Sequence, residues 1–324
     1  MESAAESGKT AANEADSCQT GELSGRPHDL PASPAAVAIF RAFDAASRVD
    51  NTQGNGTQPT NSQSKLCTSS STFIQKQIQT LGWRNRHSQA DFYPISVNGV
   101  SFDVKQVQRG ELENTYGTGA TVWPASVVMV KYLERHARRL IQNKNIVDLG
   151  SGTGITSIAA AFLGACQVIC TDGEPLVVQL ARDNIDRVAR DKANSPTSTT
   201  KDNVAAINGC PVYTQEYWWG AGSIEDHESN SGGIDIVIVS DCVLPKLYPI
   251  APLVEALDQL LSKSEAVGIL SYEHRYYPEY DPREKFKDLA IQKNLDVRII
   301  PKELHDPVYS TDDIEIWHVQ RSGI

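Results

Sequence analysis

The chain has 324 residues, of which 40% are hydrophobic, and it carries a formal net charge of −10 at pH 7. The apolar fraction is sufficient for a large buried core. The acidic balance argues against nucleic acid as a partner, because phosphate backbones require clustered lysine and arginine, and a protein segment with an exposed lysine suits this charge better.

The sequence shows no targeting, membrane or metal signal. No apolar run is long enough for a membrane helix, and the first residues, ESAAESGKT, lack the apolar core of a secretory signal. The six cysteines form no C-x-x-C pair, and the seven histidines show no zinc spacing. We therefore expect free thiols in a reducing compartment, a cytoplasmic protein, and neither a membrane nor a metal as a partner.

The first 70 residues differ in composition from the rest of the chain. They are rich in Ser, Thr, Ala, Asn, Gln and Gly, and one periodic apolar patch, Val37 to Val49, suits a short helix. Such a composition does not bury enough apolar surface to offset the entropy of ordering. It predicts a mostly disordered, low-complexity tail over residues 1–70 and one folded domain over residues 71–324.

The domain is predicted to begin with a β-hairpin. Phe92 to Gln108 alternate apolar and polar residues around Asn98-Gly99, which is typical of a tight hairpin turn. A helix is expected from Pro124 to Leu140, since proline suits the first helical turn and apolar residues follow at helical spacing. A second helix is expected from Pro175, and the polar stretch DKANSPTSTTKDN after it predicts a loop.

Between these helices lies the most informative stretch, IVDLGSGTGITSI at residues 146–158. An apolar strand runs into Gly150, Gly152 and Gly154 and then into a helix, which is typical of a loop that approaches a bound nucleoside. The spacing G-x-G-x-G differs from the dinucleotide pattern G-x-G-x-x-G. Asp148 before the glycines suits a cationic sulfonium better than a pyrophosphate. These features favour S-adenosyl-L-methionine as the ligand.

A second acidic residue supports the same ligand. Gln167 to Thr171 is predicted to be a strand that ends at Asp172, about 20 residues after the glycines, where a carboxylate can bind both ribose hydroxyls. Two simpler interpretations remain open. The glycines can form an ordinary connection between strand and helix, and Asp172 can cap the helix that follows it.

The second half of the domain continues the alternation of strands and helices. Ile234 to Val239 is a continuous apolar run, as expected for a strand buried on both faces. The predicted elements after it are a helix Ala251–Leu261, a strand Ala266–Tyr272, a helix Pro282–Lys293 and strands Leu295–Ile300 and Asp313–Gln320. The sequence thus predicts an α/β fold with a Rossmann-like, doubly wound sheet, an N-terminal β-hairpin and an antiparallel final pair of strands.

Several segments are more distinctive than the glycine motif alone: TVWPASVVMVKYL, IVDLGSGTGITSIAAAFLGA, VICTDGE, YWWG, VSDCV, SYEHR and IPKELHDPVYSTDDIEIWHV. Over residues 92–321 they resemble the seven-strand (class I) protein lysine methyltransferases, including the group that acts on valosin-containing protein. The resemblance implies the seven-stranded sheet of S-adenosylmethionine-dependent methyltransferases. It also implies an enzyme that transfers methyl groups to a lysine side chain of a protein, such as valosin-containing protein, another chaperone or an elongation factor.

The resemblance also implies where the cofactor binds. Trp123 packs beside the cofactor, although an ordinary core tryptophan is the alternative, and Trp219 of the W-G motif borders the adenine, whereas its neighbour Trp218 is not expected to face the ligand. The full set of predicted cofactor residues is Trp123, Asp148, Gly150, Ser151, Gly152, Gly154, Asp172, Trp219 and Ser240.

The substrate side departs from the family pattern. The family places D-x-x-Y after the fourth strand, where residues 241–244 read DCVL, so that Leu244 replaces the tyrosine. Tyr248, one helical turn later, is the expected substitute if the segment is helical. Asp241 is the predicted catalytic residue, which orients the incoming amine or helps it lose a proton; capping of the next segment is the alternative.

Glu273 and Arg275 in SYEHR are predicted substrate-side residues or, equally, a structural pair that holds the rim. Three other functions remain open: a nucleic-acid amino-methyltransferase, a small-molecule methyltransferase, and a cofactor-binding interaction module without catalysis. The first usually carries N-P-P-Y or D-P-P-Y where this chain has DCVL. The third is suggested by Leu244, but an intact glycine loop and Asp172 favour an enzyme.

Overall fold

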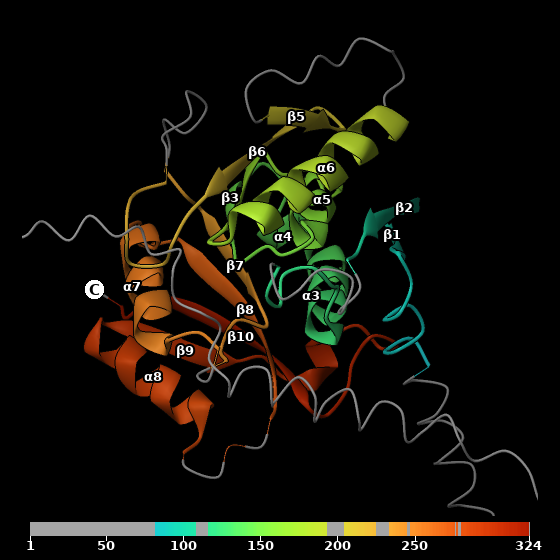
Figure 1. Ribbon diagram of the computed structural model, residues 1–324. Helices are drawn as coiled ribbons and strands as arrows, with labels where there is room; N and C mark the ends of the chain where they lie inside the picture. The colour runs from blue at the N-terminus through green and yellow to red at the C-terminus, as the bar shows by residue number, and fades with distance from the viewer. Residues whose placement is uncertain are drawn as a thin grey trace, which may run out of the picture. The chain divides into compact units, whose positions relative to one another are not determined.

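A computed structural model gives the structure of the chain (Figure 1). It describes residues 82–107, 116–192, 204–224, 233–244, 247–275, 277 and 280–323, and these residues belong to one compact unit. The predicted tail and most of the predicted loop after the Pro175 helix lie outside these residues. Both therefore stay predictions.

The centre of the fold is a sheet with the strand order β5-β6-β4-β3-β7-β8-β10-β9. The strands are β3 (Asn145–Leu149), β4 (Gln167–Asp172), β5 (Val204–Ile207), β6 (Cys210–Glu216), β7 (Ile236–Ser240), β8 (Val267–Glu273), β9 (Leu295–Ile299) and β10 (Ile314–Arg321). Strands β6, β4, β3, β7 and β8 run parallel, whereas β10 is antiparallel to both β8 and β9. The predicted doubly wound sheet and its antiparallel final pair are confirmed.

The sheet has one strand more than the seven that were predicted. Strand β5 pairs with β6 in an antiparallel hairpin at the edge of the sheet. The turn between them is Asn208-Gly209, and both residues have positive φ, of 52° and 81°. An Asn-Gly pair favours this turn because these two residue types tolerate left-handed backbone, so the sequence carried a signal for the extra strand.

Helices cover both faces of the sheet (Figure 1). They are α3 (Pro124–Arg135), α4 (Ala137–Leu140), α5 (Ile155–Phe162), α6 (Pro175–Lys192), α7 (Ile250–Leu260) and α8 (Pro282–Gln292), and a short 3-10 helix, η3 (Lys302–Leu304), precedes β10. None of the helices described is long and apolar enough to cross a bilayer. The helix predicted to continue to Leu140 ends at Arg135, because His136 leaves helical geometry with φ −113° and ψ 15°.

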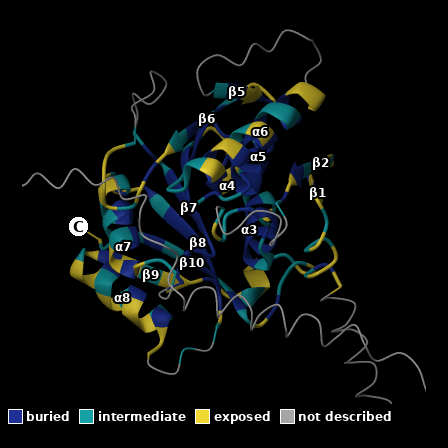
Figure 2. Ribbon diagram, viewed as in Figure 1, coloured by how far each residue is buried: buried dark blue, intermediate teal, exposed yellow. Residues whose placement is uncertain are grey.

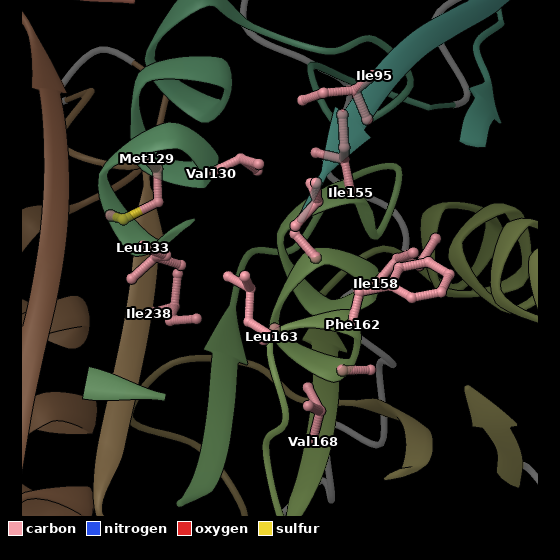
Figure 3. Close-up of a cluster of buried hydrophobic side chains, with 14 of the residues drawn as sticks. Ile95, Met129, Val130, Leu133, Ile155, Ile158, Phe162, Leu163, Val168 and Ile238 are labelled. Atoms are coloured by element: carbon pink, nitrogen blue, oxygen red, sulfur yellow. The ribbon is translucent and has the colours of Figure 1, made fainter. Parts of the chain in front are cut away.

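The central strands send alternate side chains into two separate cores, as parallel strands with helices on both faces must. The core beside α3, α5 and α6 contains Ile146, Val168, Ile236 and Ile238, and the core beside α7 and α8 contains Val147, Ile169, Val237 and Val239. Figure 2 shows these strands as buried, and Figure 3 shows Met129 and Leu133 of α3 close to Ile238. Each large apolar side chain buried here contributes about 1.5–3 kcal/mol, so the sheet is a rigid base for its carboxyl edge.

The predicted hairpin is confirmed and packs against the domain. Strands β1 (Phe92–Val97) and β2 (Val100–Lys105) pair across the turn Asn98-Gly99. Asn184 of α6 is 1% exposed and fastens the hairpin, since its amide accepts from Lys105 N at 2.7 Å and donates to Lys105 O at 3.1 Å. The same amide nitrogen donates to the carbonyl oxygen of Thr153 at 3.0 Å, which ties the hairpin to the glycine loop.

His318 on β10 gives the fold a pH dependence. Burial, with Arg139, His136 and Arg298 nearby, lowers the pKa of His318 from 6.5 to about 4. The unfolded chain therefore takes up a proton as pH falls below about 6.5 while the folded chain does not. The contribution of His318 to the free energy of unfolding is therefore complete above pH 6.5 and declines as pH falls towards 4.

We expect His318→Gln to reduce this loss of stability between pH 6.5 and pH 4. Glutamine does not titrate and can keep a hydrogen bond to the Tyr132 hydroxyl, which lies 2.9 Å from His318 Nε2. Denaturant unfolding at pH 7 and at pH 4 gives the free energy of unfolding at each pH. The decrease between the two pH values should be about 2 kcal/mol smaller in His318→Gln than in the original chain. An identical pH slope in both proteins would contradict the assignment.

Candidate active site

The sheet register brings the predicted site residues to one edge. Leu149 at the end of β3 pairs with Thr171 of β4 and with Val239 of β7. Because the three strands are parallel, Gly150 just after β3, Asp172 at the end of β4 and Ser240 at the end of β7 lie together at the carboxyl ends of adjacent strands. Ligands bind at this edge of doubly wound sheets.

The glycine loop has a backbone that other residues would strain. Gly150, Gly152 and Gly154 have φ values of 66°, 58° and 80°. A Cβ at Gly150 would lie 2.7 Å from Cys242 Sγ and 3.1 Å from the Trp219 ring, and one at Gly152 would lie 3.0 Å from the carbonyl oxygen of Gly119. These positions therefore need glycine both for backbone conformation and for close approach.

Asp172 holds the glycine loop and begins the next helix. Its Oδ2 accepts from the backbone N of Gly152 at 3.1 Å, and its Oδ1 accepts from the backbone N of Glu174 at 3.2 Å. The side chain is partly exposed, and its withdrawal from water raises the pKa of Asp172. The simpler interpretation as a helix cap is thus present in the structure, but a carboxylate has further lone pairs that can accept ribose hydroxyls.

Two aromatic side chains lie beside the glycine loop. The Trp219 ring lies against Gly150 and meets the Tyr248 ring edge to face, with centroids 5.8 Å apart. The hydroxyl of Tyr248 forms a hydrogen bond with Thr118 Oγ1. Burial raises the pKa of Tyr248 to about 12, so the phenol is neutral at physiological pH. Together they form an apolar wall with one polar edge, which suits an adenine or a lysine stem.

The segment before α3 contacts both the aromatic wall and the glycine loop. Gly119 packs against Gly152, and the indole nitrogen of Trp123 donates to the carbonyl oxygen of Thr118 at 2.9 Å. Trp123 therefore positions the segment that adjoins the loop. The sequence analysis missed Thr118 and Gly119, although the glycine-rich stretch YGTGA was a signal that the backbone approaches something closely there.

The condition set for Tyr248 was a helical segment, but the described residues around Tyr248 form no helix, and α7 begins only at Ile250. The backbone N of Tyr248 donates to the carbonyl oxygen of Leu244 at 2.8 Å, which makes a single turn. Tyr248 therefore lies one turn beyond the position where the family has its tyrosine, while Leu244 itself is buried. That Tyr248 replaces the motif tyrosine, and that it contacts substrate, both stay predictions.

Three of the predicted cofactor residues, Asp148, Ser151 and Ser240, have side chains that form hydrogen bonds with other side chains of the protein. Asp148 is fully buried, accepts hydrogen bonds from Ser157 at 2.7 Å and from Thr156, and has its pKa raised to about 6 by burial. Ser151 Oγ accepts from Cys170 Sγ at 3.1 Å. Ser240 Oγ contacts the hydroxyls of Ser126 and Ser271 at 3.0 and 3.1 Å. These bonds hold α5, β7 and the loop in place, and direct contact with cofactor remains a prediction.

Asp241 and Arg275 form a bidentate ion pair. Arg275 donates to the two carboxylate oxygens of Asp241 at 2.7 and 2.6 Å, and the aspartate side chain is 2% exposed. The expected Glu273 to Arg275 pairing is also present but is longer, at 3.4 Å. Both carboxylate oxygens thus accept charge-assisted hydrogen bonds from one guanidinium, and contact of Asp241 with a substrate amine stays a prediction.

A model of the lysine methyltransferase family matches residues 102–289, more than half of the chain. The chain belongs to this lysine methyltransferase family. The protein N-lysine methyltransferase METTL21A of Xenopus tropicalis is 32% identical over 196 residues, which cover 58% of this chain and 79% of that protein. The protein-lysine methyltransferase METTL21E of Mus musculus is 28% identical over 60% of this chain and 72% of that protein.

As a member of this family, the chain uses S-adenosylmethionine as its methyl donor, as predicted. The structure fits this cofactor, since the loop between β3 and α5 has three left-handed glycines and a partly exposed carboxylate stands at the end of the next strand. Within the residues that the structure describes, no group of three or more His, Cys, Asp and Glu is placed to hold a metal ion.

Proposed function

We propose that this lysine methyltransferase binds S-adenosylmethionine across the glycine loop and Asp172, and methylates an exposed lysine of a protein at the rim beside Tyr248 and Asp241. The observation that carries the proposal is the aromatic pair of Trp219 and Tyr248 next to Gly150 in a chain of this family. An aromatic wall at that place serves a flat base on one side and the apolar stem of a lysine on the other.

When bound, the cofactor would supply a methyl group from its sulfonium: the lone pair of a neutral lysine nitrogen would form the N–C bond while the S–C bond breaks, which would leave a thioether and a methylated ammonium. The residues of the chain provide position and electrostatics. Asp172 fixes the ribose end, Trp219 and Tyr248 exclude water, and the Asp241 carboxylate orients the amine. Lysine has a pKa near 10.4 in water, and the apolar wall favours its neutral, nucleophilic form by desolvation.

A protein is the acceptor that fits the chain best. The net charge of −10 suits a basic segment and disfavours RNA or DNA. Valosin-containing protein, other chaperones and elongation factors are the candidates, and METTL21A and METTL21E are relatives named for protein-lysine methylation. We also propose a cytoplasmic location, because the four cysteines in the part of the chain that the structure describes are free thiols.

The test is incubation of the full chain with methyl-labelled S-adenosylmethionine and a cell lysate. Label in protein that appears as methyl-lysine after acid hydrolysis supports the proposal, and mass spectrometry of purified valosin-containing protein then tests the first candidate. Label in RNA or in small molecules contradicts it. Cofactor binding in a calorimeter without any labelled product favours an interaction module instead.

A further inference from the structure

The segment before the hairpin carries a cation to the substrate side of the site. Arg84 forms an ion pair with Glu273, the last residue of β8, and a second one with Asp313 at 2.7 Å. The arginine side chain is 19% exposed and that of Glu273 is 7% exposed. Residues 84 and 313 both lie outside the family match over 102–289, so this pairing adds to the rim from the two flanking parts of the chain.

The charges at this rim alternate in one connected row. Asp241 pairs with Arg275, Arg275 with Glu273, Glu273 with Arg84 and Arg84 with Asp313. Glu273 is therefore shared between two guanidinium groups, whose positive charges oppose the effects of its burial and of the nearby Asp241 carboxylate. A buried carboxylate of this kind requires compensation by cations.

Arg84 is held in place by its neighbours. The indole nitrogen of Trp83 donates to the carbonyl oxygen of Val308 at 3.1 Å, and its ring lies 5.4 Å from that of Tyr309. The Gln106 amide donates to the carbonyl oxygens of His87 and Ala90 at 3.0 and 2.7 Å. The segment is thus fastened at both ends, which gives the guanidinium a fixed position.

We propose that Arg84 is a positioning residue for methyl transfer: it compensates Glu273 and so leaves Arg275 free to hold the Asp241 carboxylate in its bidentate geometry. This inference rests on the proposed function, in which Asp241 orients the lysine amine. Without Arg84, Arg275 is the remaining cation paired with Glu273, and it is drawn from Asp241 towards Glu273. Asp241 then loses its fixed orientation although it still has the same charge.

The test compares the variants Arg84→Met, Arg84→Lys and Arg86→Met of the full chain. The substrate is the protein that the original chain methylates in the labelling experiment above. Arg86 is an exposed cation in the same segment and serves as the matched control. We expect Arg84→Met to lower kcat about 10- to 100-fold, because small misplacements of reacting groups have effects of that size, while KM for S-adenosylmethionine changes less than about 2-fold. Arg84→Lys should recover part of kcat, and Arg86→Met should behave like the original chain.

A second measurement needs no methyl acceptor. Carbon-13 NMR of the Glu273 carboxyl, assigned with Glu273→Gln, should show its pKa rise in Arg84→Met and stay near the original value in Arg84→Lys, since removal of a nearby cation favours the protonated acid. If the original chain labels no protein, the proposed function fails, and this titration still decides whether Arg84 compensates the charge of Glu273. An unchanged Glu273 pKa, or an unchanged kcat in Arg84→Met, overturns the inference.

Discussion

Replacing Asp172 with alanine should lower the affinity for S-adenosylmethionine by roughly 100-fold or more. The expected loss consists of two charge-assisted hydrogen bonds to the ribose hydroxyls, each about 1.5–3 kcal/mol. The carboxylate also accepts from Gly152 N at 3.1 Å, so its removal loosens the glycine loop as well. Isothermal titration calorimetry with the cofactor measures the change directly.

Two further variants separate these effects. Asp172→Asn keeps one oxygen that can accept from Gly152 N but lacks the negative charge, so its affinity should lie between those of Asp172→Ala and the original chain. Asp183→Ala removes an exposed carboxylate on α6 that accepts from Gln179 at 2.9 Å, and it should bind cofactor normally. Near-normal affinity in Asp172→Ala would mean that the ribose binds elsewhere.

The second large effect is expected for Gly150→Ala. Its new Cβ would lie 2.7 Å from Cys242 Sγ, a distance that requires the backbone or the thiol to move, and 3.1 Å from the Trp219 ring. The residue would also adopt φ 66°, which costs an L-residue about 1–2 kcal/mol. We expect lower stability and at least about 10-fold weaker cofactor binding, because the loop and the aromatic wall are displaced together.

Gly99→Ala is the matched control for this strain. Gly99 has φ 77°, but a Cβ there has nothing within 4 Å. It should reduce the free energy of unfolding by about 1 kcal/mol and leave cofactor affinity unchanged. The double variant Gly150→Ala with Cys242→Ala removes the closest contact and should recover part of the affinity. Equal cofactor binding by Gly150→Ala and Gly99→Ala would show that the close approach is irrelevant to the site.

The sequence predicted the sheet well because its signals are local. Continuous runs of Val and Ile mark strands buried on both faces, and the strand predicted at Ala266–Tyr272 is found at Val267–Glu273. The glycine loop and the hairpin turn were recognised for the same reason, since positive φ selects Gly and Asn at particular positions. The helix break at His136 was missed because the apolar spacing continues through it.

The side-chain partners of the site could not be predicted in the same way. Arg275 lies 34 residues from Asp241, and Arg84 lies 189 residues from Glu273. Such pairs depend on the register of strands and on the path of distant segments, which periodicity does not encode. The same holds for Asp148 and Ser240, whose positions in the sequence suit a ligand but whose observed hydrogen bonds run to neighbouring side chains in the interior.

The most direct test of the site is a crystal structure of the chain with S-adenosylhomocysteine. We expect the ribose hydroxyls on the Asp172 carboxylate, the amino acid tail along Gly150 and Gly152, and the adenine beside Trp219. A nucleoside bound away from the carboxyl ends of β3 and β4, or a complex in which Asp172 makes no ribose contact, would contradict the account.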